Sequence, residues 1–181
     1  MSNRKKANNF ALYKTNFFKR SENNWKLLIA HKNNELIEDF LCFKNFIILE
    51  TRRNGLPYLV QINLKNNKQV YIDFKDEAYS LNLTNNNDYD SHCFSFSYSS
   101  LKSPPTIYSQ DLFTKKRKIL WKQKVLNHKE NKYVTKRVSI SARDGTKIPV
   151  SLIYKKGINL KKAPILQYGY GSYGLIIEPS F

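Results

Sequence analysis

The residues best suited to chemistry lie at positions 167–174, where tyrosines alternate with glycines after a short apolar run at 164–168. We call residues 167–174 the Tyr-Gly loop. Glycine lets a backbone come close to a ligand, and a tyrosine hydroxyl can donate a hydrogen bond. This combination is typical of a loop that stabilises negative charge on a carbonyl oxygen during acyl transfer. The sequence therefore indicates an active-site loop.

The same glycines also fit the G-x-G-x-x-G pattern of dinucleotide-binding turns, through Gly169, Gly171 and Gly174. Such a turn opens a helix and is followed by an acidic residue about 20 positions later. Here Pro179 follows within a few residues and the given sequence ends at Phe181. The pattern therefore favours an active-site loop over a nucleotide cradle, and no cofactor is expected.

The residues before this loop predict a mainly β protein, because β-branched and aromatic residues recur in short alternating runs from Phe10 to Leu120. Similar units begin at Phe10, Pro57 and Pro105. Their offset of about 47 residues is within the range of four-stranded propeller blades. Two full blades and half of a preceding one fit into residues 1–124. The alternative, on periodicity alone, is an antiparallel meander or sandwich.

A polar stretch at residues 125–136 resembles a linker. Beyond it, two alternating runs between residues 137 and 154 flank Asp144-Gly145, which is the strongest short-range signal for a hairpin with a two-residue turn. The apolar run at 164–168 then predicts a third strand, buried within a sheet.

The chain is strongly basic, with 31 Lys and Arg against 14 Asp and Glu and a formal net charge of +17. Such a balance raises nucleic acid or an anionic membrane as a partner. The basic residues, however, form short clusters beside turn-like segments, and known nucleic-acid-reading motifs are missing from the sequence. Solvated loop charge explains the excess, so neither nucleic acid nor a membrane is the expected partner.

Cys42 and Cys93 are the only cysteines, and each lies in an apolar, strand-like run. Buried, reduced thiols are expected, and the two cysteines do not have metal-ligand spacing. The residues from Met1 to Lys6 lead into a polar segment without the apolar core of a secretory signal. A cytoplasmic location is therefore expected.

Three segments carry a specific resemblance in their order and spacing: residues 141–145 (SARDG), 148–154 (IPVSLIY) and 168–174 (YGYGSYG). Residues 2–4 with 9–13, and residues 98–100 ahead of Pro104, give weaker support. Together they resemble the oligopeptidase B (protease II) group of the prolyl oligopeptidase family of serine peptidases. The resemblance covers essentially the whole chain, but only about the middle quarter of such an enzyme.

This resemblance implies a partial β-propeller at residues 1–124, its C-terminal blades, followed by the first strands of an α/β-hydrolase domain at residues 137–181. It also implies cleavage of short peptides after Arg or Lys by a Ser-His-Asp triad. In this family the second tyrosine of the motif, here Tyr170, donates its hydroxyl to the oxyanion hole. Tyr170 is the single catalytic residue that the resemblance assigns to this sequence.

The sequence departs from the family pattern because the triad is missing. It contains no G-x-S-x-G nucleophile elbow, and all three histidines precede Tyr170, whereas the acid and the histidine follow the nucleophile in α/β-hydrolases. We therefore expect an internal fragment that is inactive alone, with short basic peptides as substrates of the intact enzyme. One alternative is a noncatalytic propeller piece that complements a separately encoded catalytic part. Another is a basic β module that binds nucleic acid.

Overall fold

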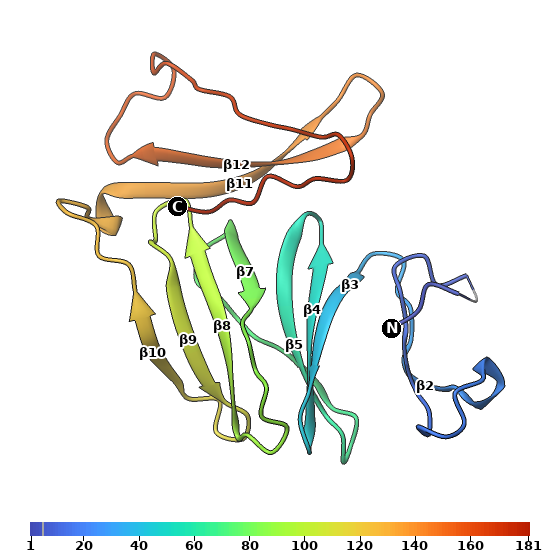
Figure 1. Cartoon of the computed structure of the whole chain (residues 1–181). Coiled ribbons are helices and arrows are strands. Elements are labelled where there is room, and N and C mark those ends of the chain that lie inside the picture. Colours follow the sequence, from blue (N-terminus) through green and yellow to red (C-terminus); the bar gives the residue numbers. More distant parts are fainter. Residues whose placement is uncertain (5) are drawn as a thin grey trace.

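The computed structural model describes residues 1–4 and 6–181, and the strands within them form four separate antiparallel sheets (Figure 1). Two sheets are four-stranded meanders in which each strand pairs with its neighbours in sequence, and the other two are hairpins. The described residues contain no α-helix, and therefore no helix long enough to span a bilayer. Their only helical turns are two short 3-10 elements, Glu22–Asn24 and Glu130–Lys132.

Both meanders are propeller blades, as the repeated units predicted. The first blade consists of β3 (Leu36–Cys42), β4 (Phe46–Arg53), β5 (Leu56–Asn63) and β6 (Gln69–Tyr71). The second consists of β7 (Tyr79–Leu83), β8 (Cys93–Ser100), β9 (Thr106–Asp111) and β10 (Arg117–Lys122). A two-stranded piece, β1 (Leu12–Lys14) with β2 (Lys26–Ile29), precedes them. The prediction of about two and a half blades is therefore confirmed.

The sequence repeat marks equivalent strands of successive blades. The units at Pro57 and Pro105 fall on β5 and β9, which are each the third strand of a blade. The unit at Phe10 contains β1, which pairs with β2 as a third strand pairs with a fourth. The half blade thus supplies the third and fourth positions of its sheet.

The blades pack face to face through a layer of aromatic and aliphatic side chains. Phe94 and Phe96 of β8 are fully buried in one cluster with Ile48 and Leu59 of the first blade. A second apolar cluster, which includes Ile47, lies between the half blade and the first blade. Because alternate residues of a strand face opposite sides, the first blade is buried on both faces. This explains why residues 46–49 form a continuous apolar run.

Two buried polar side chains also connect the full blades. The Glu50 carboxylate accepts a hydrogen bond from the Leu83 backbone N–H at 2.9 Å, and Gln61 donates its side-chain amide to the Leu112 carbonyl at 2.5 Å. Burial raises the pKa of Glu50. These bonds satisfy polar groups that would otherwise be buried without partners, and so they fix how one blade lies on the next.

A long hairpin lies across the ends of the blades, formed by β11 (Tyr133–Ser141) and β12 (Lys147–Lys155) (Figure 1). The prediction of a hairpin around Asp144-Gly145 is confirmed, but the two-residue turn is wrong. The Gly145 N–H donates to the Ala142 carbonyl, and only Gly145 has a positive φ in this loop. A type I′ turn needs positive φ at both central residues, so a three-residue loop with a glycine bulge forms instead.

Two further local expectations differ from the structure. β11 begins at Tyr133, so it includes residues 133–136 of the stretch that resembled a linker. The apolar run at 164–168 forms no strand, and Ile165 and Leu166 are almost fully exposed. Within the described chain β11 and β12 pair only with each other, and the run at 164–168 adds to neither open edge of this hairpin.

The two cysteines have free thiols, but both are exposed, so the prediction of buried thiols is wrong. Cys42 is the last residue of β3 and Cys93 is the first residue of β8. The next residue in each case, Phe43 or Phe94, is buried. Because successive side chains of a strand point to opposite faces, the cysteine beside a buried phenylalanine points away from that packed face. An apolar neighbourhood in the sequence did not reveal this.

The aromatic layer should carry much of the stability of the propeller part. We expect Phe94→Ala to lower the free energy of unfolding by about 3–5 kcal/mol, because it leaves a cavity between two blades. Leu120→Ala in the exposed strand β10 should change it by less than about 0.5 kcal/mol. Urea unfolding followed by tryptophan fluorescence measures both values. Equal effects of the two substitutions would contradict this placement of the core.

Candidate functional site

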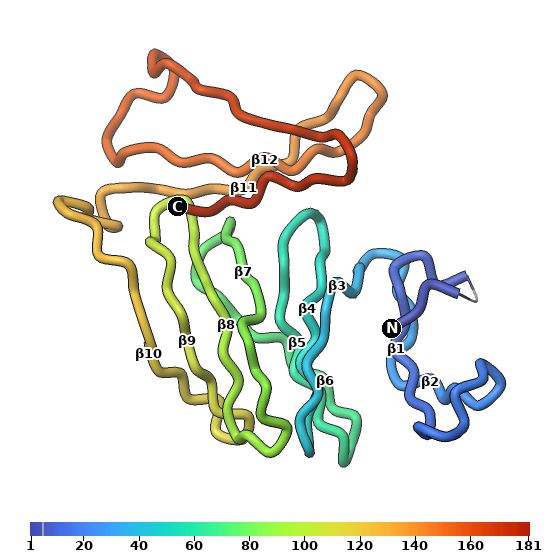
Figure 2. The backbone as a smooth tube through the Cα atoms, in the orientation of Figure 1, coloured from blue at the N-terminus to red at the C-terminus, as the bar shows by residue number. Residues whose placement is uncertain are grey.

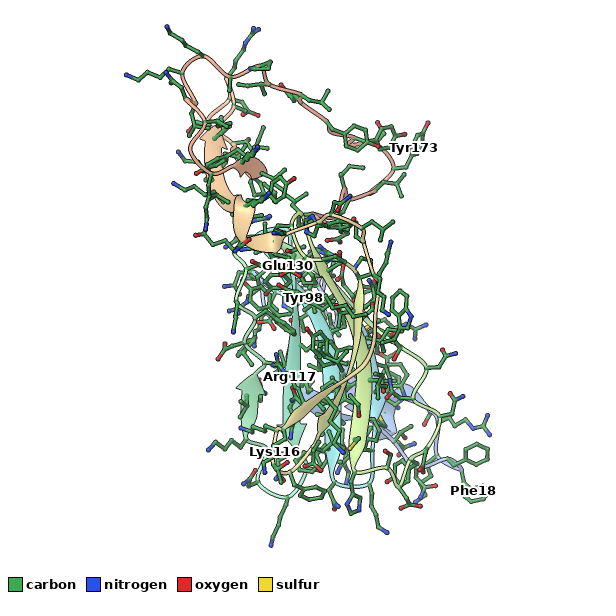
Figure 3. The ribbon with its side chains drawn as sticks, turned by 90° about the vertical axis from the view of Figure 1, so that its left-hand side faces the viewer. Phe18, Tyr98, Lys116, Arg117, Glu130 and Tyr173 are labelled. Atoms are coloured by element: carbon green, nitrogen blue, oxygen red, sulfur yellow. The ribbon has the colours of Figure 1, made fainter. Side chains whose placement is uncertain are left out.

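The Tyr-Gly loop lies outside the propeller blades, in the segment that follows β12 (Figure 2). It contains neither strand nor helix. One turn forms where the Leu175 N–H donates to the Ser172 carbonyl at 3.1 Å, with positive φ at Tyr173 and Gly174. Figure 3 shows Tyr173 at the outer edge of the molecule, away from Tyr98 of β8 and from Glu130 in the short helical turn before β11.

Tyr170 is half exposed, at 50%, and Tyr173 is 94% exposed. Among the described residues, the Tyr170 hydroxyl has no hydrogen-bond partner, so it is free to donate to a ligand. The described residues 171–181 contain no helix, so they do not supply the helix N-terminus with which a dinucleotide cradle binds phosphate. The loop therefore offers hydrogen-bond donors at a backbone that a substrate can approach.

Other residues that could take part in catalysis are not gathered near this loop. His128 has a packing role: its Nε2 lies 2.7 Å from the Lys102 carbonyl, and its ring contacts Tyr133 and Phe181. His92 contacts Phe113. In the part of the chain that the structure describes, no three His, Cys, Asp or Glu side chains lie close enough to hold a metal ion.

The end of the chain returns from the loop to the propeller. The Glu178 carboxylate lies 2.5 Å from the Arg52 guanidinium of β4, and Arg52 also binds Glu38 of β3 at 2.7 Å. Burial would lower the pKa of Arg52, but its hydrogen bonds to the two carboxylates outweigh burial and raise it. The Phe181 N–H donates to the Ser99 hydroxyl at 3.0 Å, and Pro179 is buried. In Figure 2 this segment, coloured red, passes back over the blades to end near β8.

The hairpin β11–β12 sits on the turn between β4 and β5. Asn54 and Gly55 both have positive φ, 48° and 72°, as a two-residue type I′ turn requires. Arg137 of β11 donates to the Asn54 carbonyl at 2.6 Å. A Cβ on Gly55 would lie 3.0 Å from the Arg137 guanidinium and 3.4 Å from the Pro149 ring. The Asn-Gly pair was the sequence signal that could have located this contact.

A second polar cluster lies where the blades meet the hairpin. The Asp76 carboxylate pairs with Lys102 at 2.8 Å and accepts a hydrogen bond from the Tyr98 hydroxyl at 2.6 Å. Burial alone would raise the pKa of Asp76, but these donors outweigh burial and hold it below its ordinary value. The Ser103 hydroxyl can donate its one proton either to Asp76, at 3.4 Å, or to Glu130, at 3.2 Å, in the short helical turn before β11.

Comparison with known proteins identifies the family. Residues 1–123 match a family model described as the prolyl oligopeptidase, N-terminal beta-propeller domain, over more than half of the chain. The chain belongs to the prolyl oligopeptidase family. This is a family of serine peptidases, and the match accounts for the propeller blades. The Tyr-Gly loop lies outside the matched residues.

Individual family members resemble nearly the whole chain. Dipeptidyl aminopeptidase BI from Pseudoxanthomonas mexicana is 37% identical over 177 residues, which are 97% of this chain and 24% of that protein. The structure of oligopeptidase B from Trypanosoma brucei with covalently bound antipain has a TM-score of 0.77 and 33% identity, over 86% of this chain and 23% of that chain. A prolyl endopeptidase structure has a TM-score of 0.82 over 98% of this chain and 26% of its own, at 20% identity, which concerns the fold alone.

The chain thus spans about a quarter of the length of these relatives. They represent several branches of the prolyl oligopeptidase family, and the identities do not single out oligopeptidase B.

The Asp76 cluster should make stability depend on pH. Because the pKa of Asp76 is lowered in the folded chain, its ionised form stabilises the fold above its ordinary pKa of 3.8, and this is lost as the pH falls through the folded value. We expect Asp76→Asn to lower the free energy of unfolding at pH 7 by about 1–3 kcal/mol. Urea unfolding over a pH series should show this difference vanishing in acid. Asp90→Asn, at an exposed ion pair with Lys44, should show no such trend; a pH-independent loss for Asp76→Asn would contradict the role of its charge.

The exposed loop should be an early site of proteolysis. We expect limited chymotrypsin digestion to cut after Tyr168, Tyr170 or Tyr173 before it cuts at Tyr79 or Tyr98, because the latter two are buried between blades. Mass spectrometry of a digestion time course identifies the order of cuts. Release of blade peptides while residues 167–174 remain intact would contradict the placement of the loop.

Proposed function

We propose that these residues form blades and the oxyanion-binding loop of a serine peptidase of the oligopeptidase B type. The main observation behind this proposal is that the Tyr170 hydroxyl is accessible and has no hydrogen-bond partner within the described chain. Tyr170 lies between two glycines on a loop that follows a propeller of the prolyl oligopeptidase family. Support for the branch comes from the resemblance of the segments 141–145, 148–154 and 168–174 to oligopeptidase B.

In this proposal Tyr170 acts on the carbonyl oxygen of the scissile bond. Attack on a peptide carbonyl moves negative charge onto its oxygen, and a donor held in place stabilises that charge in the transition state. One such donor lowers the barrier by about 2.7–4 kcal/mol. The phenolic O–H of Tyr170 supplies it, while Gly169 and Gly171 have open space around them and let a substrate come close.

The nucleophile, its general base and the acid must come from outside these 181 residues, which contain no G-x-S-x-G elbow. Cleavage after Arg or Lys likewise depends on carboxylates that the resemblance places elsewhere in the enzyme. We therefore propose that the chain is inactive alone. The exposed apolar residues Ile165 and Leu166 favour coverage by further polypeptide, either continuous with these residues or supplied as a separate catalytic part.

The purified 181-residue chain should not hydrolyse an arginyl dipeptide chromogenic substrate. Co-expression with a nucleophile-bearing catalytic part of a family member should give co-purification and measurable hydrolysis, because the two parts would together complete the site. Activity of the 181 residues alone would contradict the assignment of the nucleophile to another segment. Two parts that never associate would exclude complementation.

Tyr170 is tested best in a chimera in which this chain replaces the matching segment of dipeptidyl aminopeptidase BI from Pseudoxanthomonas mexicana. In an active chimera we expect Tyr170→Phe to lower kcat by about 10²–10³-fold with little change in KM, because the donor acts on the transition state. The matched control, Tyr173→Phe on the same loop, should leave kcat unchanged. Equal activity of both variants would contradict the role of Tyr170.

A further inference from the structure

The Tyr-Gly loop makes few contacts of its own. Positions where a Cβ would stand on Gly169, Gly171 and Gly174 have no atom within 4 Å. Among the described residues, the one backbone hydrogen bond of the loop joins Leu175 to Ser172 and is therefore local. The position of the loop relative to the propeller is therefore set by its flanking residues.

Of the two flanks, the C-terminal one is fixed directly to the blades. Glu178, four residues after the loop, binds Arg52 across a separation of 126 residues. The side chains of Arg52 and Glu178 are only 12% and 30% exposed, so water screens this pair less than a surface ion pair. The residues that precede the loop, by contrast, are mostly exposed from Lys155 to Leu166.

Hydrogen bonds within its own blade orient the Arg52 guanidinium for the contact with Glu178. Its Nε donates to Glu38 at 2.7 Å and its Nη1 to the Gly55 carbonyl at 3.3 Å, which leaves Nη2 for Glu178. Glu38 lies at an irregularity in the β3–β4 pairing, between the paired residues Ile37 and Asp39. Such a bulge redirects a side chain out of the regular alternation, and here it accompanies the contact of Glu38 with Arg52.

We propose that Arg52 is a positioning residue for the Tyr-Gly loop. By binding Glu178 it fixes residues 175–181 to the end of the blades at which β4 and β8 finish, which we call the rim of the propeller. Through these residues it positions Tyr170. The catalytic consequence rests on the proposed function of Tyr170, whereas the attachment of residues 175–181 to the propeller does not. In this proposal the blades contribute to the active site by positioning the Tyr-Gly loop.

Hydrogen exchange in the full 181-residue chain tests the attachment. The Phe181 N–H is a suitable probe, because it is bonded to Ser99 only while the C-terminal segment is docked. We expect Glu178→Gln to increase the exchange rate of this amide about tenfold, since it removes a charged hydrogen bond from the docked segment. Arg52→Gln should do the same.

Glu22→Gln is the matched control, because it neutralises the exposed Arg4–Glu22 pair by the same substitution far from this segment. It should leave Phe181 exchange unchanged. If Arg52→Gln fails to fold, Glu178→Gln decides the question, because it leaves the Arg52–Glu38 pair in place. Unchanged exchange in Glu178→Gln, or an equal increase in Glu22→Gln, would overturn the proposal.

The effect on catalysis is measured in the chimera described above. We expect Glu178→Gln to lower kcat about tenfold without raising KM, Glu178→Asp to recover part of the loss, and Glu178→Gln to add nothing in a Tyr170→Phe background. Faster exchange with unchanged kcat would overturn the positioning role. An inactive unsubstituted chimera would count against the proposed function instead, and the exchange experiment would still decide whether Arg52 holds the segment.

Discussion

The packing of one blade face on the next is the interaction on which the rest of the structure depends. Phe94 and Phe96 of β8 pack in one cluster with Ile48 and Leu59 of the first blade. The buried hydrogen bonds of Glu50 and Gln61 then fix the orientation of the two blades. Because β4 and β8 belong to different blades, the packing of these blades sets where the ends of the two strands lie relative to each other on the rim. That rim carries the contacts of Asn54 with Arg137, of Arg52 with Glu178 and of Ser99 with Phe181.

Contacts at the rim set the position of the Tyr-Gly loop relative to the propeller. The Asn54-Gly55 turn approaches Arg137 and so seats the hairpin, while Arg52 and Ser99 receive the last residues of the chain. These are mainly charged or polar contacts, unlike the apolar layer between the blades. Such polar contacts can hold the C-terminal part of the chain in one orientation on the propeller without a shared apolar core.

Regular features were predictable because they depend on local periodicity. The 47-residue repeat gave the blades and identified equivalent strands, and Asp144-Gly145 gave the hairpin. The predictions were wrong where the surroundings of a residue in the folded chain determine its conformation or exposure. The turn type depended on which residues adopt positive φ, the strand at 164–168 depended on a partner strand, and the exposure of Cys42 and Cys93 depended on which face of the strand is packed.

The sequence alone determined the mainly β class, the number of blades, the family resemblance and Tyr170 as the candidate donor, because repeats and motifs are written in consecutive residues. Only the tertiary structure decided which distant residues meet. The pair of Arg52 with Glu178 joins positions 126 residues apart, and no local pattern relates them. It exists because blade packing sets the rim and the chain folds back across it, which is a property of the whole arrangement rather than of either segment.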